Sequence, residues 1–389
     1  MRLDVRHNHR GGGLIAVAVM TALLAIALTP ARSLLQGAPG PIPTDPGMKV
    51  AFIGDSGNGA NFGRVLGLIR SEGAAMVMHQ GDFDYANDPE GFFATIDSIL
   101  GPNFPYFASV GNHDIDSWGE GCSNRNGCYA ALLKNRMARI GVIPDDPNLN
   151  DEMYSVTYRG LKMVFVGQEG ARAGDTVYAP YLRDQLATDD HMWKICSWHR
   201  DQTAMQLGDK RDEMGWRVYE TCKDLGAIIA TAHEHSYHRT KTLTSVQDQI
   251  VDASCPSPDT LCVARGNPGR SFVFVSGLGG ESIRPQDRCV PATPPYGCKG
   301  EWAAIYTSTQ NATYGALFIT FNAGGDPRRA RGYFKNVDGQ VVDTFEISVD
   351  ARTLSARAVA PSPPSALVHG KARRSKDLVE VSLASGGKR

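Results

Sequence analysis

Residues 48–57, MKVAFIGDSG, decide how we expect this chain to fold. A mostly apolar run ends at Gly54 and is followed at once by Asp55, which is typical of a buried strand that stops in a turn. The same pattern recurs twice, as MVMHQGDFDY at 76–85 and as PYFASVGNHD at 105–114. Each run therefore predicts a strand that ends in Gly-Asp or Gly-Asn.

Helical spacing of apolar residues lies between these strands, at 61–71 and at 89–100. Strands that alternate with helices in this way form right-handed crossover units in a parallel sheet, and ligands of such sheets gather at the carboxyl ends of the strands. We therefore expect Asp55, Asp82 and Asn112 to lie side by side on one rim, although long stretches of chain separate them.

Further along the chain, two more strands end in histidine. The run at 192–198 leads into His199, and the run at 227–231 leads into Ala232-His233-Glu234-His235. Two histidines separated by one residue project to the same side of an extended backbone. The remaining patterns predict helices at 129–140, 181–188 and 212–225, a hairpin at 153–167, and strands at 271–276, 314–321, 331–336 and 341–347.

The ends of the chain differ in composition from its body. Residues 1–32 join three arginines to an apolar run and a small-residue site, as in a cleavable secretory signal peptide. An uncleaved membrane anchor remains an alternative, although the run is short for a span. We expect a Pro/Gly linker at 33–47, one folded domain at 48–349, and a basic, disordered tail at 350–389.

Charge and cysteines narrow the class further. The formal net charge of -1 gives no reason to expect nucleic acid or an anionic membrane as a partner. The eight cysteines all follow the leader, and an even number of cysteines fits an oxidising compartment. Three short pairings (Cys122 with Cys128, Cys255 with Cys262, Cys289 with Cys298) would leave Cys196 with Cys222. Sequence alone does not fix this connectivity.

Seven polar residues are expected on the rim: Asp55, Asp82, Tyr85, Asn112, His199, His233 and His235. They are too many hard and borderline ligands for one metal ion, but they suit two ions that share one carboxylate. Such a pair can bind and ionise a water, so that hydroxide becomes available near neutral pH to attack a phosphoryl group.

The motifs resemble those of the calcineurin-like metallophosphoesterase superfamily and, within it, of the purple acid phosphatases. That group has GDxG, GDxxY, GNH(D/E), a distant His and GHxH in this order. Here they read GDSG at 54–57, GDFDY at 81–85, GNHD at 111–114, His199, and AHEH at 232–235. The resemblance implies an α/β fold, a four-layer αββα sandwich of two mixed β-sheets.

The same resemblance implies which residue binds which ion. Asp55, Tyr85 and His235 would bind the first metal, Asn112, His199 and His233 the second, and Asp82 would bridge them. A phenolate such as that of Tyr85 suits Fe(III). The second ion would be divalent iron, zinc or manganese, and composition cannot choose among them.

The loops suggest further roles in binding and catalysis. His113, next to Asn112, would reach the phosphate and protonate the leaving oxygen, with Asp114 orienting its ring. The loop after His199 has no further histidine, unlike that of plant members, so Arg200 is expected to contact phosphate. Ala232 replaces the glycine of GHxH and should fit if its backbone angle is ordinary.

We therefore expect an exported, dinuclear metal-dependent phosphoesterase that hydrolyses small phosphomonoesters. Two alternatives remain open from sequence: a phosphodiesterase or nucleotide hydrolase with the same site, and a surface binding protein that keeps the fold without turnover. Localisation is expected to be secreted, periplasmic or at the cell surface, with no stable membrane span after leader cleavage. The oligomeric state is not predicted.

Overall fold

A computed structural model describes residues 40–350 except 120, 147–151 and 168–169. The predicted signal peptide at 1–32, residues 33–39 of the linker and residues 351–389 of the basic tail lie outside the described residues. Residues 40–47 of the predicted linker are attached to the body, because the backbone of Ile42 hydrogen-bonds to Asp190 and Met192. The folded body therefore begins upstream of the predicted residue 48.

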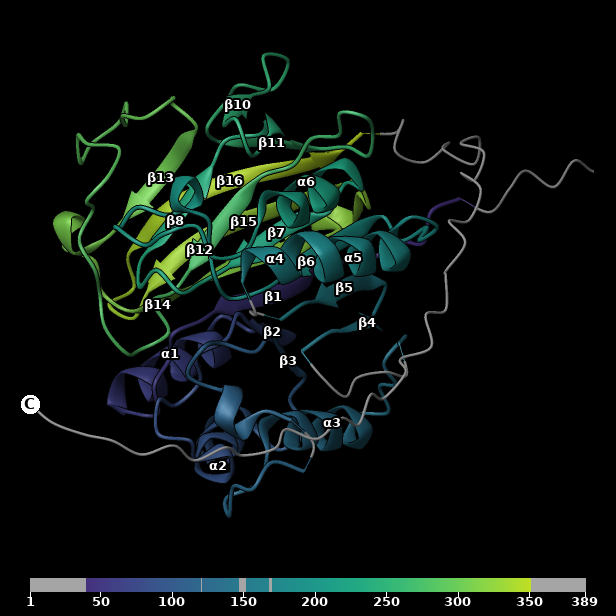
Figure 1. The fold of residues 1–389 in the computed structure, drawn as a ribbon, viewed down its shortest axis with the longest axis vertical. Coiled ribbons are helices and arrows are strands. Elements are labelled where there is room, and N and C mark those ends of the chain that lie inside the picture. The colour runs from purple at the N-terminus through teal and green to yellow at the C-terminus, as the bar shows by residue number, and fades with distance from the viewer. Residues whose placement is uncertain (1–39, 120, 147–151, 168–169, 351–389) are drawn as a thin grey trace, which may run out of the picture. The chain divides into compact units, whose positions relative to one another are not determined.

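The described residues contain two seven-stranded mixed sheets (Figure 1). The first sheet has the order β11-β16-β15-β14-β1-β2-β3, in which β1, β2 and β3 run parallel. Its strands are β1 (Met48–Ile53), β2 (Met76–His79), β3 (Tyr106–Ala108), β11 (Thr260–Val263), β14 (Gly315–Phe321), β15 (Arg329–Asn336) and β16 (Val341–Val349).

The second sheet has the order β13-β8-β12-β7-β6-β5-β4, in which β5, β6, β7 and β12 run parallel. Its strands are β4 (Tyr154–Tyr158), β5 (Leu161–Phe165), β6 (Trp193–Ser197), β7 (Ile228–Thr231), β8 (Tyr237–Thr240), β12 (Val273–Ser276) and β13 (Trp302–Tyr306). A small separate ribbon pairs β9 (Leu243–Ser245) with β10 (Ile250–Val251).

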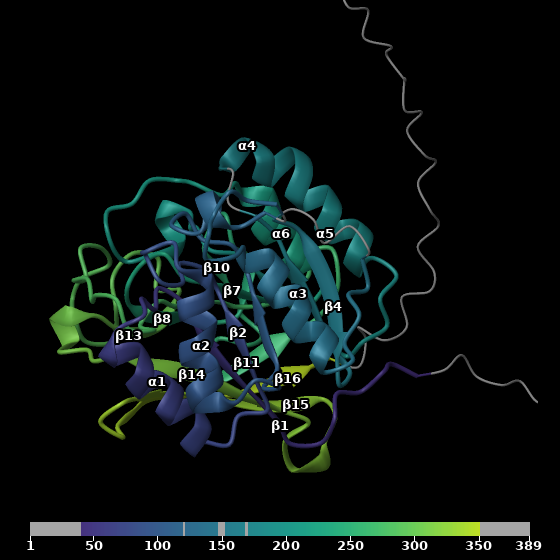
Figure 2. The same ribbon diagram turned by 90° about the horizontal axis from the view of Figure 1, so that it is seen from below.

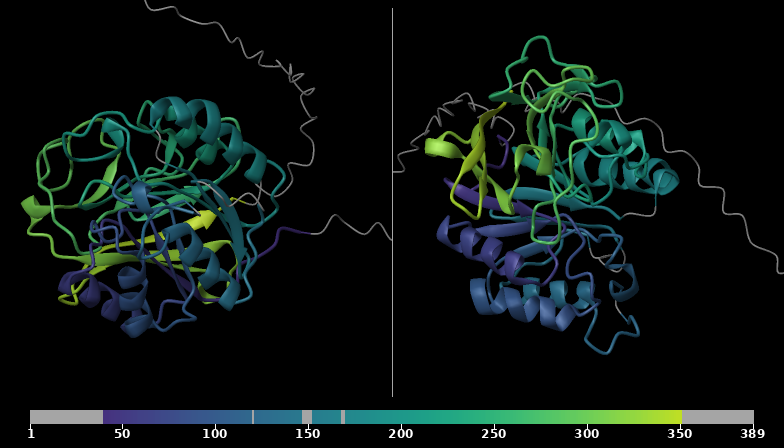
Figure 3. Two further views of the ribbon diagram at one scale, coloured as in Figure 1. Left: turned by 60° about the horizontal axis from the view of Figure 1, so that its bottom comes forward. Right: turned by 90° about the vertical axis from the view of Figure 1, so that its left-hand side faces the viewer.

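Helices cover the outer face of each sheet, as Figure 2 from below and Figure 3 from the side show. The first sheet carries α1 (Ala60–Ser71), α2 (Pro89–Leu100) and α3 (Tyr129–Arg139). The second carries α5 (Ala179–Leu186) and α6 (Trp216–Asp224), with the short α4 (Ala171–Ala173) and a π-helical turn (Gly174–Tyr178) before α5. The predicted four-layer αββα sandwich is confirmed.

Three apolar layers hold the sandwich together. Between the sheets, Phe52 and Phe107 of the first sheet pack in one cluster with Phe165 and Phe274 of the second. The other two clusters lie between each sheet and its helices. Strands with both faces covered read as continuous apolar runs, which explains why 48–53 was recognisable from sequence.

Agreement with the predicted elements is best where glycine or proline marks an end. β1 and α2 have the predicted bounds, and β4 and β5 form the hairpin predicted at 153–167, with its turn at Arg159-Gly160. The strands predicted around β2 and β3 are shorter in the structure. β8 to β11 and β13 were not predicted, and α6 begins four residues later than expected, after Gly215 with φ 93°.

All four disulfides join the predicted partners, and they bind all eight cysteines. Three of them close short loops. Cys196 and Cys222 instead join β6, the strand that leads into His199, to α6 on its outer face. This disulfide therefore connects a site-bearing strand to its covering helix.

Replacing both Cys196 and Cys222 with alanine should lower the free energy of unfolding by about 3 kcal/mol, because the unfolded chain regains the entropy of an open loop. Urea unfolding monitored by circular dichroism would measure it. The matched control is the double replacement of Cys122 and Cys128, which close a loop of sequence separation 6 rather than 26. If the control variant lost as much free energy of unfolding or more, the Cys196–Cys222 disulfide would not be the more stabilising of the two.

Candidate metal centre

The two sheets present their strand ends to a common site. Asp55 follows β1, Asp82 and Tyr85 follow β2, Asn112 follows β3, His199 follows β6, and His233 and His235 follow β7. Hydrogen bonds between the sheets, such as that of Ser276 Oγ to the Phe52 carbonyl (2.9 Å), help to fix their relative position. All seven residues predicted as ligands are thus brought to one rim.

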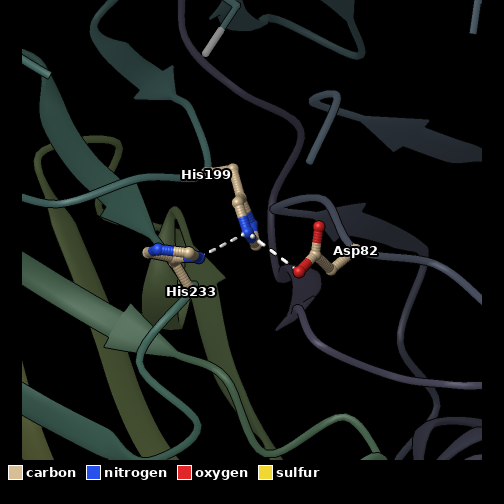
Figure 4. A group of neighbouring side chains, drawn as sticks. All are labelled: Asp82, His199 and His233. Carbon is tan, nitrogen blue, oxygen red and sulfur yellow. Dashed lines mark hydrogen bonds and ion pairs between the residues drawn. The ribbon is translucent and has the colours of Figure 1, made fainter. Parts of the chain in front are cut away.

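Three of them surround the Nε2 atom of a fourth, His199 (Figure 4 shows His199 with two of the three). This atom lies 3.2 Å from Asp82 Oδ2, 3.2 Å from Asn112 Oδ1 and 3.0 Å from His233 Nδ1. Ligands at about 2.1 Å from one ion lie about 3 Å from each other, so the spacing suits a metal. We refer to this group as site 2.

The hydrogen bonds on the far side of each ring assign the tautomers. His199 Nδ1 lies 2.8 Å from the Gln80 carbonyl, to which it can only donate. His233 Nε2 lies 2.9 Å from the Glu213 carboxylate and donates to it. When both histidines are neutral, as metal ligands are, the two inward-facing nitrogens each carry a lone pair, and they face each other beside two further oxygen acceptors.

Such an arrangement of acceptors needs a cation at its centre. Although burial lowers it, the charge of Asp82 raises the pKa of His199 to about 9, so a proton is held there in the absence of metal. Burial lowers the pKa of His233 to about 3 and keeps it neutral, as a metal ligand requires. The donor set therefore fits a metal ion at site 2.

A second group of donors lies beside the first. Tyr85 Oη is 3.2 Å from both Asp55 Oδ1 and His235 Nε2, and those two atoms are 3.3 Å apart. The three atoms form a nearly equilateral triangle, as on one face of an octahedral coordination shell. We refer to this group as site 1. Asp82 is the residue that the resemblance places between the two sites.

Burial at site 1 also calls for a cation. It raises the pKa of Asp55 to about 7. Burial, followed by the charges of Asp55 and Asp82, raises the pKa of Tyr85 above its ordinary value. The phenolate would therefore form only where a metal ion replaces its proton.

Unusual backbone angles aim these ligands. Four of the ligands have φ between 53° and 65°, a backbone region that residues other than glycine rarely occupy: Asp55, Asp82, Tyr85 and His233. The loops also approach each other closely, since a Cβ on Gly111 would lie 2.1 Å from the Asp82 nitrogen. Backbone strain of this kind is concentrated at functional sites.

Asp114 does not do what the sequence suggested. It was expected to orient the ring of His113, but its buried carboxylate accepts the backbone N–H groups of Asp82 (2.9 Å), Phe83 (2.9 Å) and Gly111 (2.7 Å). Among the described residues it makes no hydrogen bond to that ring. Asp114 therefore joins the loops after β2 and β3, and we regard it as a positioning residue for Asp82.

The predicted substrate contacts lie at the edge of the centre. His113 is exposed, and its ring packs on the Tyr85 ring with the centroids 4.4 Å apart. Its backbone N–H donates to Asp82 Oδ1 (2.9 Å). Arg200 lies beside Glu213, with Nη1 3.9 Å from Oε1. Ala232 has an ordinary backbone angle and fits in place of glycine, as expected.

Sequence reasoning missed several residues around the ligands. Glu213 and Gln80 fix the rings of His233 and His199, and the Ser282 hydroxyl contacts His235 Nδ1. Lys210 donates to the His233 carbonyl, and Arg284 pairs with Glu234. Ser282, Lys210 and Arg284 lie in loops without periodicity, and Glu213 lies in a loop where a helix was predicted. No sequence motif marks any of the five.

Comparison with known proteins agrees with this geometry. A profile of the calcineurin-like phosphoesterase family matches residues 48–237. No curated protein matches the chain. A solved purple acid phosphatase, PPD1 from yellow lupin (Lupinus luteus) seeds, has a TM-score of 0.57 and 21% identity, covering 84% of this chain. This chain spans only 58% of the lupin chain. At this identity the likeness supports the fold.

Two other solved structures are more distant. PhoD has a TM-score of 0.46 and 11% identity over 81% of this chain and 72% of that one. GAP50, described as the anchor in the inner membrane complex of Plasmodium, has a TM-score of 0.47 and 12% identity over 78% of this chain and 89% of that one. The family match itself implies a dinuclear metal centre.

Replacing Glu213 with glutamine should weaken metal binding at site 2 about 10- to 100-fold, because the carboxylate that fixes the His233 tautomer is lost. Calorimetric titration of the metal-free protein with zinc would measure the change. Glu346→Gln, an exposed glutamate on β16, serves as the control. Unchanged affinity in the Glu213 variant would show that the ring is held by other contacts.

Proposed function

We propose that this chain, which belongs to the calcineurin-like phosphoesterase superfamily of hydrolases, is an exported dinuclear metal enzyme that cleaves phosphomonoesters. The observation that carries the proposal is the cluster of inward-facing acceptors around His199 Nε2, with a second triangle of donors beside it. Carboxylate, imidazole, amide and phenol ligands in this proximity suit two hard or borderline ions.

In this proposal the ligands divide as the motifs suggest. Asp55, Tyr85 and His235 would hold one ion at site 1, and Asn112, His199 and His233 would hold the other at site 2, with Asp82 between them. When bound, the two ions act as Lewis acids and lower the pKa of a bound water. We propose Fe(III) at site 1 because of Tyr85, and divalent iron, zinc or manganese at site 2.

The residues around the ions supply binding and proton transfer. Asn112, His113 and Arg200 are proposed to contact the phosphate. Water gives up a proton to the solvent and its oxygen bonds to phosphorus, the phosphorus–oxygen bond of the ester breaks, and His113 gives a proton to the leaving oxygen. His113 suits this role because its ring is exposed beside Tyr85 and can reach a substrate.

Water is the proposed attacking group because no covalent nucleophile is evident among the residues that the structure describes. All eight cysteines are in disulfides. The histidines of the centre face the metal sites or, in the case of His113, lie beside them. Direct transfer of the phosphoryl group to water then follows.

Export rests on independent features. Four disulfides are typical of extracellular proteins. The proposed signal peptide at 1–32 lies outside the described residues. Among the residues that the structure does describe, we find no helix with the length and apolar character that a membrane span requires. We therefore propose that the folded body works in a secreted, periplasmic or surface location.

The purified protein with its metals intact should hydrolyse phenyl phosphate faster than diphenyl phosphate, and it should absorb visible light through a phenolate-to-iron transition. Replacing Asp82 with alanine should abolish turnover because both sites lose a ligand. Tyr85→Phe should remove the colour. Rate assays, metal analysis and a visible spectrum of the same samples would measure these effects.

Other results of these assays would indicate a different class of protein. Preference for the diester without colour would favour a phosphodiesterase with the same site. Absence of turnover with both metals bound would favour a binding protein and overturn the proposal. Unchanged turnover in the Asp82 variant would contradict the assignment of the site.

Replacing His113 with asparagine should slow the hydrolysis of phenyl phosphate about 100-fold, because its leaving oxygen needs a proton. Nitrophenyl phosphate, whose leaving group is stable as an anion, should lose much less. Comparison of kcat for the two esters at saturating substrate measures this difference. Equal losses would mean that His113 binds phosphate without donating a proton.

A further inference from the structure

Two cations that the proposed mechanism does not use lie beside site 1. Residues 282–284 run along His235: the Ser282 hydroxyl contacts its ring, and the Arg284 backbone N–H donates to its carbonyl (2.9 Å). Ser282 is exposed, and the side chain of Arg284 is 39% exposed. This segment therefore forms an accessible border next to a proposed ligand of site 1.

The second cation approaches from another loop. Lys210 donates to the carbonyl of His233 and is partly buried. Its loop starts at His199 and ends at Glu213, so both of its ends contact the centre. Lys210 is therefore held against the backbone of the same short segment, 233–235, that Arg284 contacts.

The two loops are fixed to each other. The Leu207 carbonyl accepts backbone hydrogen bonds from Asp287 (2.9 Å) and Arg288 (3.1 Å), and Arg288 Nη1 also donates to the Gln206 carbonyl (2.8 Å). A Cβ on Gly208 would lie 2.7 Å from the Glu234 carboxylate, so the first loop closes directly over that side chain. Lys210 and Arg284 therefore lie on two loops that are hydrogen-bonded to each other.

The guanidinium of Arg284 is only partly covered by the protein. It pairs at 3.5 Å with Glu234, which is 1% exposed between the two histidines of its motif. Glu234 Oε1 makes no hydrogen bond within the described residues. Asp55 and Asp201 also act on Lys210, and Asp287 acts on Glu234, so this border carries charges of both signs. The exposed part of the guanidinium keeps the capacity to bind an anion.

We propose that Lys210 and Arg284 form an anion subsite beside site 1, and that it receives a negatively charged group on the alcohol part of the substrate. The inference rests on the proposed phosphoesterase function and narrows its substrate class to esters with a second anionic group, a carboxylate or another phosphate. Arg284 contacts this group directly, while Glu234 positions the guanidinium.

Three esters with a flexible alcohol part test the subsite: propyl phosphate, carboxyethyl phosphate and propanediol bisphosphate. The wild-type protein with its metals bound should prefer both anionic esters over propyl phosphate in kcat/KM. Arg284→Gln should reduce that preference about tenfold, mainly through KM, because a charge-assisted hydrogen bond is lost. Arg284→Lys should restore part of it. A preference for only one anionic ester identifies the group that the subsite accepts.

Controls separate this inference from the function on which it rests. Arg331→Gln removes another arginine paired with a glutamate, on exposed β15, and should leave the preference unchanged. Lys210→Met should act as Arg284→Gln does, with metal content measured to show that the centre is intact. Turnover of propyl phosphate without preference for either anionic ester, or equal losses on all three esters, overturns the subsite alone. Absence of turnover of any ester overturns the phosphoesterase function as well.

Discussion

The facing lone pairs of His199 Nε2 and His233 Nδ1, 3.0 Å apart, are the constraint on which the centre depends. Each ring donates outward, to the Gln80 carbonyl and to Glu213, so neither can relieve the contact by changing its tautomer without losing a hydrogen bond. Either a metal ion between the acceptors or a proton on His199 Nε2 makes the arrangement favourable. The fold thus holds in place a set of groups that would repel one another in the absence of both.

Holding them requires rigid support on both sides. Four of the proposed ligands have left-handed backbone angles, and each such residue costs about 1 to 3 kcal/mol. The rigidity comes from four buried strands, β1, β2, β6 and β7. Each has one apolar face covered by the opposite sheet and the other covered by helices. Asp114 adds three hydrogen bonds that join the loops after β2 and β3. Its position next to His113 in the sequence suggested that it orients the His113 ring. Sequence spacing alone does not show where a buried carboxylate points.

The sequence predicted those elements and site residues whose positions depend on neighbouring residues in the chain. β1 and α2 are bounded by Gly54 and Pro89, and parallel strands that end in Gly-Asp carry their carboxylates to one rim by geometry alone. β8 was missed because its sequence, YHRT, has no apolar pattern, and its buried Arg239 is matched by Asp343, a hundred residues away. Lys210 and Arg284 were missed for the same reason: their neighbours are set by tertiary contacts.

Residues placed by strand ends and residues placed by loops also differ in their proposed roles. The strand ends carry most of the metal ligands, and the loops carry the residues proposed to select the substrate. Six proposed ligands lie within four residues of a strand end, whereas Tyr85 lies farther from the end of β2. The shape of its loop comes from Asp84, which accepts hydrogen bonds from the backbone N–H groups of Ala86, Asn87 and Asp88. Asn87 is in turn bonded to Asn124, inside the loop closed by Cys122 and Cys128. Tyr85, the proposed Fe(III) ligand, therefore depends on a loop braced by a disulfide, and the cations beside site 1 depend on other loops. A change in these loops would alter the metal or the substrate while the strand ends kept the remaining ligands in place.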